Sequence, residues 1–319
     1  MRRPAARAVV AAFAGATLLL TACSPTPGNP APGAGDGVVD VVASTSVYGD
    51  IVGTIGGDKV RVTSVITRTS QDPHSYEATT QDKLAVSKAE LVVENGGGYD
   101  DFIHKLADDT GLDHGSVLNA VELSGLAPEE PAGASPAADG HGHSPAGFNE
   151  HVWYSLPAMA RMADAVAAKL GELEPSSAGT FRSNAAAFKD SLGGLEAKLA
   201  GLKASAGAAP VAVTEPVPLY LLEAAGLANQ TPGEYTAAIE EDADVPPAVL
   251  KATTDLMRAG SIRLLAYNQQ TEGPQTVAVR DAAAAAGVPV VNFSETLPEG
   301  TTYLQWMTGN VDNIAKALA

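Results

Sequence analysis

Short apolar runs alternate with helical patterns along the first part of this chain. A β-branched run over residues 38–43 predicts a buried strand, because Val favours extended backbone. A helical pattern over 47–55 follows, and an alternating pattern over 59–66 predicts a second strand. The next elements predicted are a helix over 81–88, a strand over 91–93 and a helix over 99–110. Strands that alternate with helices predict parallel βαβ units.

Two long helical patterns occupy the middle of the chain, over 155–173 and 175–203. Pro175 is compatible with the first turn of the second helix. Gly193-Gly194 weakens the middle of that helix by roughly 1 kcal/mol per glycine relative to alanine. Large apolar residues nevertheless recur at three-, four- and seven-residue steps and form one face, namely Phe181, Phe188, Leu192, Leu195, Leu199 and Leu202.

A second alternation of strands and helices completes the chain. The predicted strands are 210–214, 264–267 and 288–292, and the predicted helices are 217–225, 246–259, 276–286 and 303–318. We therefore predict an α/β fold with two Rossmann-like lobes, at 38–172 and 206–319, joined by one long rigid helix at 173–205. Parallel sheets bind ligands at the carboxyl ends of their strands. The expected site lies in the cleft between the lobes.

The first 23 residues have the pattern of a bacterial lipoprotein signal peptide. Arg2, Arg3 and Arg7 form a positive segment before an apolar stretch over 9–20, which is too short to span a membrane. The stretch ends in Leu20-Thr21-Ala22-Cys23, which resembles a lipobox, so Cys23 is the expected lipid-bearing residue. An ordinary secretory signal with a chance cysteine is the alternative. Residues 24–37 are rich in Pro and Gly and predict a flexible tether.

Composition and charge exclude several classes of protein. Cys23 is the only cysteine, so the chain forms no internal disulfide and no thiolate metal site. The net charge of −17 becomes −20 without the first 23 residues, which hold three of the 20 basic residues and none of the 37 acidic ones. Such an acidic chain is not expected to bind nucleic acid. No later apolar stretch is long enough to cross a membrane.

Two of the six histidines stand in distinctive settings. His74 lies in the segment Asp72-Pro73-His74-Ser75-Tyr76-Glu77, and His151 lies in Asn149-Glu150-His151-Val152-Trp153. Both follow expected loops, beside rigid or aromatic residues that would fix their rings. Neutral imidazole is the commonest protein ligand for transition metals. Metal capture is therefore the first hypothesis.

The second lobe offers two carboxylates at the ends of its predicted strands. Glu215 directly follows the strand at 210–214, and Glu295 follows the strand at 288–292. Because ligands gather at the carboxyl ends of parallel strands, these carboxylates would face the two imidazoles. Two imidazoles and two carboxylates would then surround one divalent ion.

These segments resemble the substrate-binding lipoproteins of zinc- or manganese-importing ABC transporters, the metal-specific cluster A-I group. The resemblance covers nearly the whole mature chain and includes the lipobox, the long helix and segments 72–77, 149–153 and 293–297. In that family, residues corresponding to His74, His151, Glu215 and Glu295 bind the metal. The resemblance implies an extracytoplasmic protein, anchored to the bacterial cell membrane through lipid on Cys23. It would pass the ion to an ABC permease and its ATPase. A monomer with limited closure of its lobes is expected.

The chain departs from the family pattern near the expected ligands. Asn149-Glu150 replaces the usual Asp-Pro before the second histidine. The third ligand is histidine in typical zinc members and glutamate in typical manganese members, and here it is Glu215. The fourth is usually aspartate, and here it is Glu295.

One divalent transition metal ion is the expected ligand, with Zn²⁺ slightly favoured over Mn²⁺. Two nitrogens with two carboxylates suit Mn²⁺ or Fe²⁺, whereas Zn²⁺ also accepts such mixed ligands and binds more tightly in general. Zinc-binding relatives often carry a loop rich in His and acidic residues. His141 and His143, within an expected surface loop at 127–147, form a reduced version of it and a possible auxiliary metal site.

A binding protein is favoured over an enzyme. Four protein ligands would close the shell of the ion, whereas a catalytic metal keeps one position open. The sequence contains no His-Glu-x-x-His motif or nucleophile elbow, and Gly96-Gly97-Gly98 stands outside any phosphate-loop pattern. A metal-dependent hydrolase is the competing class, and a metal chaperone or adhesin with the same fold is a third. His104 and His114 lie in no motif and are expected at the surface.

Overall fold

The first lobe is built on a parallel four-stranded sheet. The structure, a computed structural model, describes residues 37–127 and 148–319. The strands are β1 (Val39–Thr45), β2 (Val60–Ile66), β3 (Leu91–Glu94) and β4 (Val117–Asn119), in the order β2-β1-β3-β4. Val41 of β1 pairs with Val62 of β2 and with Leu91 of β3. This central position explains why β1 is apolar almost throughout, since its two faces are both covered.

Alternate residues of β1 face two different layers of helices. Val41 and Ala43 join a core that includes residues of α1 (Ser46–Gly56), whereas Val42 joins a smaller core with residues of α2 (Thr80–Val86) and α3 (Asp101–Thr110). The short helix α4 (Ala120–Ser124) follows β4. The 3₁₀ turns η1 (Gly57–Lys59) and η2 (His114–Ser116) precede β2 and β4.

The second lobe repeats this arrangement. Its strands are β5 (Pro210–Val213), β6 (Ala228–Asn229), β7 (Leu265–Asn268) and β8 (Val290–Phe293), all parallel and ordered β6-β5-β7-β8. Its helices are α7 (Leu219–Ala224), α8 (Gly233–Glu240), α9 (Pro247–Arg258) and α10 (Pro274–Ala285). Residues of α8, α9 and α10 pack together on one face of the sheet, around Tyr235, Met257 and Val279.

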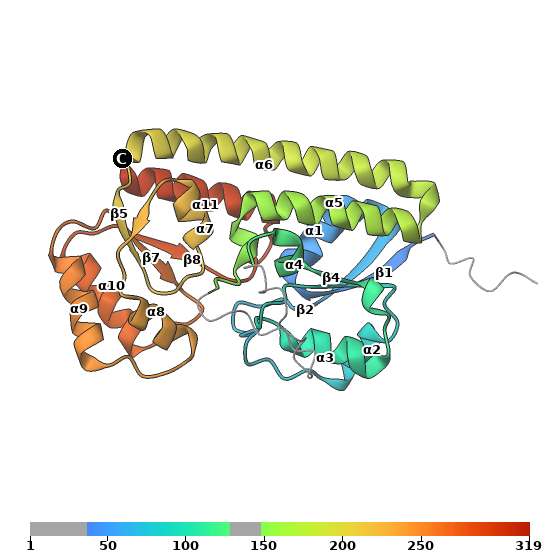
Figure 1. Cartoon of the computed structure of the whole chain (residues 1–319), viewed down its shortest axis with the longest axis horizontal. Coiled ribbons are helices and arrows are strands. Elements are labelled where there is room, and N and C mark those ends of the chain that lie inside the picture. The colour runs from blue at the N-terminus through green and yellow to red at the C-terminus, as the bar shows by residue number, and fades with distance from the viewer. Residues whose placement is uncertain (1–36, 128–147) are drawn as a thin grey trace, which may run out of the picture. The chain divides into compact units, whose positions relative to one another are not determined.

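A 29-residue helix, α6 (Ala178–Ala206), runs along both lobes (Figure 1). It packs against α1 and α5 (Leu156–Leu173) of the first lobe and against α7 and α11 (Tyr303–Leu318) of the second. The predicted apolar face is buried at all its positions except Leu202, which is partly buried. One apolar core therefore continues from the first sheet through α6 to the second sheet. This continuous core opposes large hinge motion, because interiors are close-packed.

The predicted α/β fold with two parallel sheets and a long helix is confirmed. Pro175 lies in a separate 3₁₀ turn, η4 (Pro175–Ser177), so α6 begins three residues after that proline. The elements that the pattern missed are β4, α4, β6 and α8, which have between two and eight residues. Such short elements complete at most about two periods, which are too few to show a pattern.

Among the described residues, no helix is both long and apolar enough to cross a membrane. The predicted signal peptide with Cys23, the tether up to residue 36, and residues 128–147 with His141 and His143 lie outside the described residues.

Candidate metal site

His74 lies in the loop after β2. The carboxylate of Asp72 accepts hydrogen bonds from the backbone N–H of His74, at 3.0 Å, and from the hydroxyl of Ser75, at 2.7 Å. This is a turn that Asp side chains commonly stabilise. The side chain of His74 is 32% exposed, and it lines a surface pocket of about 590 Å³ together with residues of α2 and α3. His74 is thus the candidate ligand that solvent reaches.

His151 lies just before α5 and is 2% exposed. Its Nδ1 lies 2.7 Å from Oδ1 of Asn149, which also accepts the backbone N–H of His151 at 3.1 Å. An amide oxygen only accepts hydrogen bonds, so Nδ1 carries the proton and Nε2 keeps its lone pair for a ligand. The amide nitrogen of Asn149 donates to the backbone carbonyl of Pro216 at 3.0 Å. An aspartate at this position could not donate that bond to the second lobe.

The carboxylates of Glu215 and Glu295 lie at the ends of strands in the second lobe, and each residue is 4% exposed. The side-chain nitrogen of Asn268, the last residue of β7, donates to both: to Oε1 of Glu295 at 2.7 Å and to Oε2 of Glu215. The hydroxyl of Thr271 also donates to Glu215, at 2.5 Å. The hydroxyl of Tyr99, in the first lobe, donates to Oε2 of Glu295 at 3.2 Å. Asn268 thus holds the two carboxylates as a pair.

The glycine run at 96–98 positions Tyr99. All three glycines have positive φ, at 76°, 68° and 87°, a conformation that side chains with a Cβ rarely adopt. The loop brings the Tyr99 ring edge-on to His74, with centroids 4.9 Å apart, and to within 4.7 Å of the ring of Trp153. The glycine run at 96–98 thus has a structural role, which is to position Tyr99.

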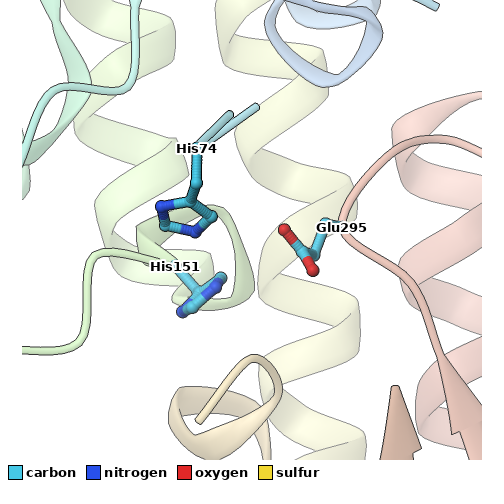
Figure 2. A group of neighbouring side chains, drawn as sticks. All are labelled: His74, His151 and Glu295. Atoms are coloured by element: carbon cyan, nitrogen blue, oxygen red, sulfur yellow. The ribbon is translucent and has the colours of Figure 1, made fainter. Parts of the chain in front are cut away.

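Three of the four predicted ligands come together between the lobes (Figure 2). Single ligand atoms of His74, His151 and Glu295 all lie within 4.8 Å of one another. Ligand atoms bound to one zinc ion at about 2.0–2.2 Å lie within roughly 4.4 Å of one another, so small side-chain movements suffice to enclose an ion. Glu215 stands outside this group and adjoins it through Asn268, which it shares with Glu295.

Two further carboxylates approach the same place. Ligand atoms of Glu150, His151 and Glu240 also lie within 4.8 Å of one another. One carboxylate oxygen of Glu240, at the end of α8, is buried without a hydrogen-bond partner among the described residues. Oε1 of Glu150 lies 3.7 Å from Nε2 of His74, too far for a hydrogen bond. Sequence reasoning missed Glu240, because it follows no strand and belongs to no motif.

Burial sets the charge of these groups in opposite directions. It lowers the pKa of His151 well below the usual value, with a further decrease caused by His74, and it also lowers the pKa of His74 itself. Burial raises the pKa of Glu295 to about 8, and the nearby charge of Glu215 adds to that rise. It likewise raises the pKa of Glu240 to about 8, with Glu150 as the next cause. The imidazoles are therefore neutral at pH 7, whereas the carboxylates need a cation before they ionise fully.

Tyrosine hydroxyls fasten the His151 segment to the second lobe. Tyr220 of α7 donates to the backbone carbonyl of Asn149 at 2.6 Å, and Tyr303 of α11 donates to that of Trp153 at 2.7 Å. In the reverse direction, Tyr154 donates to the backbone carbonyl of Ser294 at 2.7 Å. These bonds fix the positions of His151 and Glu295 relative to each other.

Fold and site together define a two-lobed α/β binding protein in which side chains that could hold a metal ion lie between the lobes. The chain matches the model of the family described as zinc-uptake complex component A periplasmic, ZnuA, over residues 41–317. It belongs to this family. The resemblance inferred from the sequence motifs is thus confirmed.

Relatives and solved structures agree with this assignment. The chain is 24% identical over 298 residues to the manganese ABC transporter substrate-binding lipoprotein ScaA of Streptococcus gordonii, covering 88% of this chain and 89% of that protein. It is 25% identical over 295 residues to the manganese ABC transporter substrate-binding lipoprotein PsaA of Streptococcus pneumoniae, covering 87% and 88%. The periplasmic zinc binding protein TroA from Treponema pallidum superposes with a TM-score of 0.68 at 22% identity, over 89% of this chain and all of that one. At this identity the structural similarity shows the fold.

Proposed function

We propose that this protein captures a divalent transition metal ion, Zn²⁺ or Mn²⁺, and delivers it to an ABC-type importer. The observation that carries the proposal is the meeting of His74, His151 and Glu295, with their ligand atoms within 4.8 Å of one another. These side chains come from both lobes, so a bound ion would be held by both. The names of the relatives, which are substrate-binding lipoproteins of metal transporters, support the same function.

In this proposal the two histidines bind the ion through neutral nitrogens, and Glu295 supplies a charged oxygen. Glu215 is the fourth ligand, because Asn268 holds its carboxylate beside that of Glu295. The ion replaces the proton that burial keeps on Glu295, whose pKa is raised to about 8. The nitrogen and oxygen donors suit both metals: the carboxylates favour the harder Mn²⁺, and the general order of affinities favours Zn²⁺.

The partners are a membrane permease and its ATPase, which the names of the relatives imply. Lipid on Cys23 anchors the mature protein at the outer face of the cytoplasmic membrane, and the protein works as a monomer without catalysing a reaction. His141 and His143 are proposed as an auxiliary metal loop. These parts of the proposal rest on the sequence, since those three residues lie outside the described residues.

The test is a competitive titration of the tag-free mature protein with Zn²⁺ and Mn²⁺ against a chelator of known affinity. One tight equivalent is expected, and His74→Ala should remove it. Glu223→Gln, which changes an exposed carboxylate on α7, is the matched control and should bind like the wild type. Unchanged tight binding in His74→Ala would refute the site, and the absence of any tight binding in the wild type would refute the function.

A further inference from the structure

A second group of metal-ligating side chains lies at the end of α3, outside the site described above. It consists of His104, Asp108 and His114, and single ligand atoms of the three lie within 4.8 Å of one another. The rings of His104 and His114 have centroids 5.8 Å apart and are inclined by 33°. None of these residues belongs to the inter-lobe site.

The local fold brings these three residues together. His104 and Asp108 are four residues apart on α3, so their side chains share one face of the helix. The helix ends at Gly111, whose φ of 69° is left-handed and turns the chain back. His114 then lies in the 3₁₀ turn η2, with its Nε2 3.5 Å from Oδ1 of Asp108.

A buried carboxylate supports His104 from behind. Nδ1 of His104 lies 3.2 Å and 3.3 Å from the two carboxylate oxygens of Glu94, which is 2% exposed. Asn119 of β4 donates to the same carboxylate at 2.8 Å and fixes its orientation. A histidine that donates its Nδ1 proton to a carboxylate presents Nε2 to a ligand, and metal-bound histidines almost always have such a partner.

A plain surface ion pair explains less of this arrangement. A pair between Asp108 and His114 would exist only while His114 is protonated, and exposed pairs contribute little to stability. Such a pair also gives no reason for the third group, His104, or for the carboxylate buried behind it.

We propose that His104, Asp108 and His114 form a second, weaker binding site for a divalent transition metal ion, with Zn²⁺ as the best match. Two nitrogens and one carboxylate oxygen are ligands that zinc accepts, and water would fill the fourth position. The side chains of His114 and Asp108 are 70% and 46% exposed, so this site exchanges its ion with solvent more readily than the buried inter-lobe site. The proposal uses other residues than the proposed function and does not depend on it.

The test is a calorimetric Zn²⁺ titration of the tag-free mature protein in which His141 and His143 are both changed to alanine, which removes any contribution of their loop. A tight and a weaker equivalent are expected. His114→Ala should weaken the second equivalent at least tenfold and leave the first unchanged, whereas His74→Ala should do the reverse. Glu94→Gln should weaken the second equivalent about tenfold, because loss of a carboxylate that supports a ligand typically costs 10- to 100-fold.

Asp109→Asn is the matched control, since Asp109 lies beside Asp108 on the same helix but pairs with Lys83, at 2.8 Å. This variant should keep both equivalents. Absence of the weaker equivalent from the double-alanine background would overturn the proposal, and so would a weaker equivalent that survives His114→Ala. Cobalt absorption spectra of the same variants should include a Co²⁺ signal that His114→Ala removes and that His74→Ala and Asp109→Asn keep.

Discussion

The two lobes contribute chemically different halves of the inter-lobe site. The first lobe supplies His74 and His151, whose pKa values are lowered by burial, so both are neutral at pH 7. The second supplies Glu215 and Glu295, whose pKa values are raised by burial. The imidazoles are therefore neutral with or without an ion, whereas Glu295, whose pKa is raised to about 8, becomes fully anionic at pH 7 only beside a cation.

Each half contains one asparagine that contacts the candidate ligands, and the two asparagines use opposite ends of their amide groups. Asn149 uses its amide oxygen to accept the Nδ1 proton of His151, and Asn268 uses its amide nitrogen to donate to both carboxylates. The imidazole is thereby fixed in one tautomer, and the two carboxyl groups are held close together by a shared donor. An amide can do both because it carries a donor and an acceptor.

The largest expected effect is the loss of an imidazole from the first half. His151→Ala should lower the affinity for Zn²⁺ and for Mn²⁺ by more than about 100-fold, because loss of a supporting residue alone costs 10- to 100-fold. Chelator competition measures this change. A decrease below tenfold would mean that His151 is not a ligand.

The next largest effects distinguish the role of Asn268 from that of Asn149. Asn268→Ala should lower metal affinity by about 10- to 100-fold. It should also lower the free energy of unfolding of the metal-free protein by about 1–3 kcal/mol at pH 8, because the carboxylates lose a shared donor. Chemical denaturation at pH 6 and pH 8 measures the second effect, which should be smaller at pH 6, where the carboxylates are more protonated.

Asn149→Ala provides the matched comparison for Asn268→Ala. The metal affinity of Asn149→Ala should fall by a factor in the same range. Its loss of free energy of unfolding should be no larger at pH 8 than at pH 6, because Asn149 contacts the neutral imidazole of His151. Identical pH dependence in the two variants would contradict the division of the site into a neutral and an acidic half.

The pH dependence of binding tests the acidic half directly. Because Glu295 has a pKa of about 8 without an ion, each ion that binds near pH 7 should release a proton, and the affinity should rise with pH toward about tenfold per unit. Calorimetry in buffers of different ionisation enthalpy counts the protons. Binding at pH 7 without proton release would show that the carboxylates are already ionised.

The metal-free protein should lose stability at both ends of the pH range. As the pH rises from 4.5, the usual pKa of Glu, toward 8, the folded chain keeps the proton of Glu295 that the unfolded chain has lost, so the free energy of unfolding decreases. Below pH 6.5, His151 binds a proton in the unfolded chain but stays neutral in the folded chain, where it is buried. The free energy of unfolding therefore decreases there as well. Bound metal should abolish the decrease in the free energy of unfolding between pH 4.5 and pH 8. Denaturation curves at several pH values, with and without Zn²⁺, would measure this change.

The smallest expected effect concerns the hydrogen bond that joins the halves. Tyr99→Phe removes the bond to Glu295 but keeps the ring against His74 and Trp153. A hydrogen bond contributes about 0.5–1.5 kcal/mol, so metal affinity should fall by no more than about tenfold. A much larger loss in competition titrations would assign Tyr99 a direct role in binding.

The sequence predicted the parts of the fold that repeat a period several times. The apolar face of α6 and the strand of 38–43 are examples, since buried positions recur there over many residues. Strands as short as Val117–Asn119 and Ala228–Asn229 have no period to detect and form because neighbouring strands offer hydrogen-bond partners. Their existence depends on contacts between distant residues.

The candidate site shows the same limit. The rule that places Glu215 and Glu295 after predicted strands applies equally to Asn268, which follows the strand predicted at 264–267. Glu240 and Tyr99 carry no such signal, because their positions depend on how α8 and the glycine loop fold back. The four-residue spacing of His104 and Asp108 indicates that they share one face of a helix. The position of His114 beside them depends on the turn at Gly111.

The most direct test of the central claim is anomalous diffraction from crystals grown with Zn²⁺ and with Mn²⁺. The strongest anomalous peak should lie between the lobes, bonded to Nε2 of His151, to an imidazole nitrogen of His74 and to a carboxylate oxygen of Glu295. A strongest peak elsewhere, or an ion bound by residues of only one lobe, would contradict the account.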